Sequence, residues 1–253
     1  FNGTEALAMG TVIGSNISNI ALIFGVSCIG VSMRPAKTNL VQFIPFVVAA
    51  IILGYVLLDL KISVIEGWIL LIIFVLFIFI TYKYRGSEAE DEIAESTTGT
   101  ITILLYLTVG LLALIGGSNF AVIHAEKIAN ILNVPQLIIG LTIIALGTSL
   151  PELAATISAI IKNKNDMVIG NVIGSNVMNI ALVLPIIGFF SDTSFDSTVL
   201  SRDYFVMLTA TILFVLLAAT YSSNKINLKF IRFIGCIFVA GYFGYILNLS
   251  NLI

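Results

Sequence analysis

The stretch Gly10-Thr-Val-Ile-Gly-Ser-Asn-Ile-Ser-Asn-Ile-Ala-Leu22 recurs as Gly170-Asn-Val-Ile-Gly-Ser-Asn-Val-Met-Asn-Ile-Ala-Leu182. Ten of the thirteen positions are identical. Two unrelated stretches of this length would share about one residue, so the chain contains an internal repeat. Both copies lie in strongly apolar surroundings. Repeats in such surroundings are typical of secondary transporters, whose substrate binds where the two copies meet.

Composition predicts an all-α, polytopic membrane protein. The chain is 58% hydrophobic and 10% charged, and its mean hydropathy is +1.09. Its apolar runs are continuous rather than alternating, which indicates helices and not a barrel, and they are about long enough to cross roughly 30 Å of hydrocarbon. We expect about eight transmembrane helices, over 6–32, 39–58, 63–83, 100–124, 136–161, 166–190, 203–221 and 228–248.

One long polar stretch, 83–99, divides the chain into segments 1–82 and 100–253. It carries five carboxylates between Glu88 and Glu95 and lacks the ligand spacing of an EF-hand, so we interpret it as an acidic, solvated linker. Three helices precede the linker and five follow it, and the second repeat copy is preceded by two helices that the first copy lacks. The chain also opens with Phe1. We therefore expect a five-plus-five protein of ten helices, whose first two helices lie outside this sequence.

The basic residues of the loops predict the orientation of the helices. Alternating the eight helices across a bilayer places nine Lys and Arg residues on one side and three on the other, so we expect the linker to be cytoplasmic. The same count gives the two repeat copies opposite orientations, which is the arrangement that alternating access requires. The larger group is Arg34, Lys37, Lys83, Arg85, Lys162, Lys164, Lys225, Lys229 and Arg232, and the smaller is Lys61, Lys127 and Arg202.

The helix expected over 136–161 carries a carboxylate near the middle of the membrane. Pro151 has no N–H and should break this helix near Gly147–Leu150, which frees backbone carbonyls that can face a cation. Thr148, Ser149 and Glu152 should share one face. A carboxylate costs about 2.5–3.5 kcal/mol at mid-bilayer and usually marks an ion or proton site. We interpret Glu152 as such a site.

The repeated hydroxyl and amide side chains add neutral oxygen ligands. Ser15 and Asn19 in the first copy, and Ser175 and Asn179 in the second, are spaced i, i+4 and share a face. Asn16 and Asn176 should point to the other face of their helices and serve structural roles. Close helix packing is the alternative explanation for all these small polar residues. A set of carboxylate, hydroxyl, amide and carbonyl oxygens suits a hard cation such as Ca²⁺ or Na⁺.

The motif Gly147-Thr-Ser-Leu-Pro-Glu152, followed by Gly170-Asn-Val-Ile-Gly-Ser-Asn176, resembles the second alpha repeat of the cation/calcium exchanger superfamily, in particular the prokaryotic sodium/calcium exchangers. The stretch Gly10-Thr-Val-Ile-Gly-Ser-Asn16 resembles the later part of the first alpha repeat. The resemblance implies an inverted-repeat exchanger fold in a prokaryotic inner membrane. It also implies a site made of Glu152, Thr148, Ser149, the Ala145 carbonyl, Ser175, Asn179, Ser15 and Asn19.

The resemblance implies an antiporter that moves Ca²⁺ against a Na⁺ gradient. Asn at both 19 and 179 does not favour dependence on K⁺, because potassium-dependent members favour Asp at such a position. The first copy of the carboxylate motif is absent from this sequence, so the chain alone should form half of a Ca²⁺ site and should not transport. An H⁺/Ca²⁺ antiporter and a cation channel remain alternatives.

The expected partners are Ca²⁺, Na⁺ and the lipid bilayer, with no nucleic acid. We expect no cofactor beyond the transported ions, because the sequence has no Walker motif that would indicate the use of ATP. It also has no nucleophile–base pair that would indicate an enzyme. The oligomeric state is not predicted.

Overall fold

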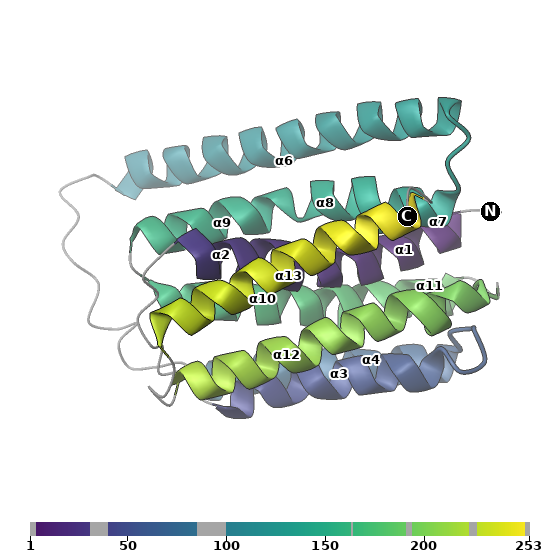
Figure 1. The fold of residues 1–253 in the computed structure, drawn as a ribbon, viewed down its shortest axis with the longest axis horizontal. Coiled ribbons are helices and arrows are strands. Elements are labelled where there is room, and N and C mark those ends of the chain that lie inside the picture. Colours follow the sequence, from purple (N-terminus) through teal and green to yellow (C-terminus); the bar gives the residue numbers. More distant parts are fainter. Residues whose placement is uncertain are drawn as a thin grey trace.

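The computed structural model describes residues 4–30, 40–84, 100–162, 164–190, 194–222 and 227–250. They form a bundle of helices that run roughly along one common axis, with α6 on one outer side and α3 and α4 on the opposite side (Figure 1). Seven helices of the described part are long and apolar enough to cross a membrane, and a shorter apolar helix covers Leu40–Val56. The seven are Glu5–Gly30, Val64–Lys83, Ile101–Ile131, Gln136–Ile161, Met167–Phe190, Val199–Thr220 and Leu228–Leu249.

Several of these spans consist of α-helical segments joined by π-helical ones. The first is α1 (Thr4–Ile17), η1 (Ser18–Phe24) and α2 (Gly25–Gly30); the fourth is α7 (Gln136–Ile139), η3 (Gly140–Ile144), α8 (Ala145–Thr148) and α9 (Leu150–Ile161). The fifth is α10 (Asn165–Met178), η4 (Asn179–Val183) and α11 (Leu184–Phe190), and the sixth is η5 (Val199–Tyr204) and α12 (Phe205–Ser222). The others are α3 (Ile44–Val56, after the 3₁₀ turn Leu40–Phe43), α4 (Val64–Lys83), α6 (Thr100–Ile131) and α13 (Leu228–Leu249).

Helices occur in all the predicted regions; two of them are longer than predicted, and the one predicted over 39–58 is shorter, at Leu40–Val56. Helix α6 ends at Ile131 rather than at 124, because the polar residues near its end are good helix formers. It stops where Asn133 adopts a positive φ of 57° and Pro135 follows, a common way to end a helix. The sixth span begins at Val199 rather than at 203.

The two repeat copies run in opposite directions through the bundle. The first copy begins in α1 and continues into α2, whereas the second begins in α10 and continues into α11, and these paths are antiparallel (Figure 1). The predicted inverted repeat is therefore confirmed. Both copies change from α-helix to π-helix at nearly the same repeat position, at Ser18 in one and Asn179 in the other.

The described basic residues divide between the two ends of the bundle as predicted. Helices α4 and α9 finish, and α13 starts, at one end of the bundle, whereas α4 starts and α6 finishes at the other end (Figure 1). By their positions in the sequence, Lys83, Lys162 and Lys229 belong to the first end and Lys61 and Lys127 to the second. The linker residues 85–99 fall outside the described residues, as do Arg34, Lys37, Arg85 and Lys225.

The outer faces of the bundle are apolar. Large side chains such as Ile65, Phe79, Leu112 and Phe243 are exposed on α4, α6 and α13. A water-soluble protein rarely exposes so continuous an apolar surface, whereas hydrocarbon chains solvate it without cost. Together with the seven apolar spans, this surface identifies an integral membrane protein.

Glycines allow the first span to cross the fourth at very short distance. A Cβ on Gly14 would lie 2.5 Å from the carbonyl oxygen of Leu141 and 2.8 Å from the Ala145 Cβ. A Cβ on Gly10 would lie 2.6 Å from the Leu137 carbonyl oxygen. Because backbone atoms form these contacts, rotamer changes cannot relieve them. The crossing places the repeat block 10–22 directly against the segment that precedes Pro151.

Gly14→Ala should therefore destabilise the protein by about 1–3 kcal/mol, the usual cost of overpacking a well-packed interior. The measurement is the midpoint of thermal unfolding in detergent. Gly241→Ala is the matched control, because a Cβ there meets no described atom within 4 Å. Equal midpoints for the two variants would contradict the close crossing.

Candidate cation-binding site

The fourth span is interrupted at Ser149, as the position of Pro151 predicts. Helix α8 ends at Thr148 and α9 begins at Leu150, with Ser149 between them at φ −88° and ψ −2°. The carbonyl oxygen of Gly147, four residues before the proline, accepts a hydrogen bond from the Ser118 hydroxyl of α6. The break is thus confirmed, although a neighbouring helix already occupies this freed carbonyl.

Two hydroxyl pairs join the first repeat copy to this interruption. The Ser15 and Thr148 hydroxyl oxygens are 3.0 Å apart, and those of Ser18 and Ser149 are 2.9 Å apart. The Ala145 carbonyl oxygen accepts from the hydroxyls of both Ser15 and Thr148, at 3.4 and 3.1 Å. Ser15, Ser18 and Ser149 are buried, whereas Thr148 is exposed. Four predicted site residues therefore lie together: Ser15, Ala145, Thr148 and Ser149.

Asn19 joins the two repeat copies to each other. Its Nδ2 donates to Ser175 Oγ at 3.0 Å and to Asn176 Oδ1 at 3.1 Å. Ser175 in turn donates to the Asn171 carbonyl oxygen at 2.8 Å. The prediction that Asn176 points away from Asn19 and Ser175 is wrong, because the Asn19 amide lies between the adjacent residues Ser175 and Asn176 and reaches both.

Glu152 lies in the first turn of α9, close to α10. Asn171 Nδ2 donates to the backbone carbonyl of Glu152 at 2.9 Å and to Thr156 Oγ1 at 3.0 Å. Glu152 lines a groove of about 460 Å³ between α6 and α9, together with Asn171, Pro151 and Tyr106. The residue as a whole is half-buried, while its Oε2 is enclosed.

Several buried acceptor atoms have no hydrogen-bond partner within the described ranges. Two of them, Glu152 Oε2 and Asn19 Oδ1, belong to the polar cluster, whereas Asn16 Oδ1 lies on a side chain that donates to its own helix. Leaving a buried polar atom unpaired costs about 1–3 kcal/mol, and more for a charged group, so such atoms call for an explanation. A cation bound in the cluster would satisfy Glu152 Oε2 and Asn19 Oδ1. Among the described residues there is no group of three or more His, Cys, Asp or Glu side chains, so neutral oxygens would supply most of the ligands.

Asn179 has no hydrogen bond to this network, which Glu152 joins only through its backbone carbonyl. It is half-buried at the start of η4, four residues after Ser175, and has no hydrogen-bond partner among the described residues. Its amide is therefore not tied to the hydroxyl pairs.

Three further residues take part that the sequence analysis missed. Ser18 contacts Ser149, Ser118 contacts the Gly147 carbonyl, and Asn171 contacts the backbone of Glu152. Comparison of the two repeat copies does not point to these residues, because none of them recurs in the other copy. The counterpart of Ser18 is Met178 and that of Asn171 is Thr11. Ser18 lies three residues after Ser15, and this helical spacing was the only available signal.

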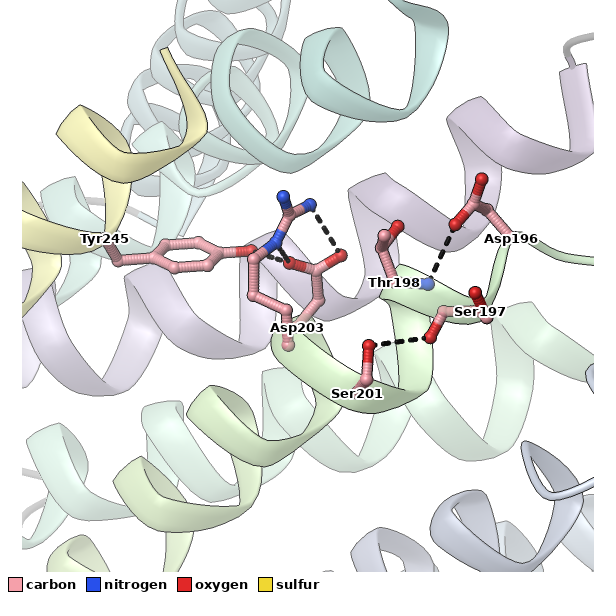
Figure 2. A network of polar contacts seen from close by, with 7 residues as sticks. Asp196, Ser197, Thr198, Ser201, Asp203 and Tyr245 are labelled. Carbon is pink, nitrogen blue, oxygen red and sulfur yellow. Dashed lines mark hydrogen bonds and ion pairs between the residues drawn. The ribbon is translucent and has the colours of Figure 1, made fainter. Parts of the chain in front are cut away.

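A second buried carboxylate, Asp203, lies in the sixth span and is bound by its own neighbours (Figure 2). Arg202 Nε lies 2.7 Å from Asp203 Oδ1, and Arg202 Nη2 lies 3.2 Å from Oδ2. The Tyr245 hydroxyl of α13 donates to Oδ1 at 2.9 Å. Both oxygens of the Asp203 carboxylate therefore accept hydrogen bonds, and the Arg202 guanidinium neutralises its charge. We assign Asp203 to the connection between η5 and α13 and not to the cation site.

The loop before η5 holds a further carboxylate, Asp196, at the membrane edge (Figure 2). The backbone N–H of Thr198 donates to Asp196 Oδ1 at 2.8 Å. Hydrogen bonds from the backbone and side chain of Thr198 lower the pKa of Asp196. This carboxylate therefore stays ionised at the mouth of the bundle at neutral pH.

Asp203→Asn should lower stability by about 3 kcal/mol, because it leaves the Arg202 charge without its counter-ion. Any effect of added Na⁺ or Ca²⁺ on the unfolding midpoint should be the same as in the wild type. Thermal unfolding and ion titrations of the purified protein measure the two effects, and Asp59→Asn, at an exposed turn, is the control. Altered ion dependence at unchanged stability would place Asp203 in the cation path instead.

Comparison with known proteins gives consistent matches over most of the chain. The family model described as "Sodium/calcium exchanger protein" matches residues 1–83 and 102–250. The putative antiporter CaxA of Alkalimonas amylolytica is 34% identical, with 97% of this chain and 79% of that protein covered. The inner membrane protein YrbG of Escherichia coli (strain K12) is 35% identical, with 83% and 68% covered.

A solved structure of the sodium-calcium exchanger NCX_Mj, soaked with Na⁺ and Sr²⁺, superposes with a TM-score of 0.73 at 32% identity. The match covers 94% of this chain and 75% of that one. The chain belongs to the sodium/calcium exchanger protein family.

Proposed function

We propose that the protein is a secondary active antiporter that moves Ca²⁺ across the membrane against a Na⁺ gradient by alternating access. The observation that carries the proposal is the pair of unpartnered acceptors, Glu152 Oε2 and Asn19 Oδ1, inside a polar cluster where two inverted repeat copies meet. Relatives named as antiporter or sodium-calcium exchanger support it. Under this proposal the protein is a transporter and not an enzyme.

The chemistry of the cluster fits hard cations. Carboxylate, hydroxyl and amide oxygens are the ligands that Ca²⁺ prefers, and Na⁺ accepts the same set. Glu152 supplies the negative charge, and Ser15, Thr148, Ser149, Ser175, Asn19 and Asn179 supply neutral oxygens, with the Ala145 carbonyl fixing two of the hydroxyls. Because both ions need the same carboxylate, occupation by one excludes the other, which is the basis of exchange.

The arrangement of the repeats supplies the two access states. Two copies of opposite orientation can exchange conformations and so open the same site to either side of the membrane. The groove beside Glu152, between α6 and α9, gives that carboxylate an access path. Movement of α6 relative to α9 would close this path.

The orientation of the bundle in the membrane follows from its charged ends. The end that carries Lys83, Lys162 and Lys229 is the cytoplasmic one by the positive-inside rule, which places the 83–99 linker in the cytoplasm. The location is a prokaryotic inner membrane, in line with the name of the Escherichia coli relative. With Na⁺ entering, Ca²⁺ would leave the cell.

The test is ⁴⁵Ca²⁺ uptake into proteoliposomes that contain the complete gene product. Uptake is measured with an outward Na⁺ gradient, with an outward H⁺ gradient and with no gradient. We expect uptake with Na⁺ alone. Uptake with H⁺ alone would overturn the Na⁺ coupling and make Glu152 a proton carrier. Uptake that is equal with and without gradients would indicate a channel, and no uptake at all would contradict Ca²⁺ transport.

A further inference from the structure

The Asn19 side chain is held in one orientation by two acceptors from the other repeat copy. Its Nδ2 donates to Ser175 Oγ at 3.0 Å and to Asn176 Oδ1 at 3.1 Å. An amide nitrogen has two hydrogens, so both are used. The Asn19 and Asn176 side chains are fully buried, at 1% and 0% exposure, so water cannot replace these bonds. Asn19 Oδ1 remains without a partner in the described part of the chain.

The Ser175 hydroxyl and Asn176 Oδ1 together fix the orientation of the Asn19 amide. Its proton is donated to the Asn171 carbonyl oxygen at 2.8 Å, so its oxygen acts as an acceptor toward Asn19. A flipped amide would place the Asn19 oxygen against this acceptor and against Asn176 Oδ1. Two buried oxygen–oxygen contacts would replace two hydrogen bonds, which strongly disfavours the flip.

The corresponding residue of the first repeat copy does not form such a contact. Asn16 donates from Nδ2 to the Val12 carbonyl of its own helix at 2.8 Å. Asn16 is as deeply buried as Asn176, and both occupy the same place in the repeated Gly-Ser-Asn. The two copies therefore share the residue but not its contact with the asparagine of the opposite copy.

We propose that Asn176 is a positioning residue that fixes the Asn19 amide with its carbonyl oxygen toward the transported cation. This rests on the proposed function of the Asn19–Glu152 cluster. Without Asn176 the Asn19 amide can rotate and present its NH₂ group to the ion. Ca²⁺ loses more than Na⁺, because the attraction of a dipolar oxygen scales with the charge of the ion. Asn176 thereby sets the preference of the exchanger for Ca²⁺ over Na⁺.

The experiment compares Asn176→Leu, which removes the acceptor, with Asn176→Asp, which keeps one, and with Asn16→Leu as the matched control. The readouts are the KM for Ca²⁺, the maximal exchange rate and the half-saturating Na⁺ concentration in proteoliposomes. We expect Asn176→Leu to raise the KM for Ca²⁺ about tenfold or more and to change the maximal rate less than threefold. Asn176→Asp should keep the KM at or below that of the wild type, and Asn16→Leu should leave it unchanged.

A double-mutant cycle tests whether Asn176 acts through Asn19. In an Asn19→Ala background, Asn176→Leu should have no further effect on Ca²⁺ binding, measured as equilibrium ⁴⁵Ca²⁺ binding to purified protein. Equal effects of Asn176→Leu and Asn16→Leu would overturn the proposal, as would additive effects in the cycle.

A replacement variant and the wild-type measurement separate misfolding and failure of the proposed function from failure of the Asn176 role. Asn176→Ala replaces Asn176→Leu if the larger side chain prevents folding, and the same rise in KM is expected of it. A wild-type protein that shows no Ca²⁺ exchange would contradict the proposed function itself. Wild-type exchange with an unaltered Asn176 variant would contradict only the role of Asn176.

Discussion

Replacing Glu152 by Gln should lower Na⁺-driven Ca²⁺ exchange at least about a hundredfold while the protein still folds. The side chain keeps its size, but it loses the negative charge that compensates the cation. At an effective dielectric of about 20, the attraction between a carboxylate and a divalent ion in contact is several kcal/mol, and each 1.4 kcal/mol is a factor of ten. Initial rates of ⁴⁵Ca²⁺ uptake in proteoliposomes, normalised to inserted protein, measure the loss.

The control for this substitution is Glu66→Gln. Glu66 caps the start of α4 at the edge of the membrane, where its carboxylate accepts hydrogen bonds from Ser63. A glutamine can accept the same bonds, so exchange should stay close to that of the wild type. Wild-type rates in the Glu152→Gln variant would remove Glu152 from the cation site.

Asn179→Asp should shift the ion preference toward Ca²⁺ by about tenfold or more. Asn179 is the repeat counterpart of Asn19, and its half-buried amide has no hydrogen-bond partner within the described residues. A new carboxylate there would give the site a second negative charge. For a separation of roughly 5 Å at an effective dielectric of about 20, the added attraction is about 3 kcal/mol larger for Ca²⁺ than for Na⁺, before the cost of burying the charge.

Titration of Na⁺ against ⁴⁵Ca²⁺ uptake, together with the dependence on K⁺, measures this shift. Asn227→Asp adds the same charge at the N-cap of α13, where Asn227 accepts from the Lys229 N–H, and should change nothing because Asp caps equally well. If Na⁺, K⁺ and Ca²⁺ dependence in Asn179→Asp matched the wild type, Asn179 would be no ligand.

The sequence predicts the helices and the break at Pro151 because both depend on local chemistry. Hydropathy locates the spans, and a proline inside an apolar helix disrupts it wherever it lies. The recurrence of block 10–22 as block 170–182 also predicts that the two copies meet inside the membrane. The Ser15 and Thr148 hydroxyls lie 3.0 Å apart, because the Gly14 crossing brings their helices together.

Contacts between neighbouring positions of different helices could not be predicted. A helical wheel places Ser175 and Asn176 about 100° apart, and assigns them to different faces, yet one Asn19 side chain between them reaches both. The π-helical turn that begins at Ser18 also rotates the residues after it relative to an ideal helix. Asp203 shows a similar limit, because hydropathy counts its charge as a loop signal and cannot foresee its pairing with Arg202.

The most direct test is competition between Na⁺ and Ca²⁺ for the purified protein. Equilibrium binding of ⁴⁵Ca²⁺ is measured while Na⁺ is raised at constant ionic strength with choline as the replacement, for the wild type and for Glu152→Gln. We expect Na⁺ to displace Ca²⁺ from the wild type, and we expect Glu152→Gln to bind little Ca²⁺ at any Na⁺ concentration. Ca²⁺ binding that neither Na⁺ nor the loss of the Glu152 charge affects would contradict a shared cation site at Glu152.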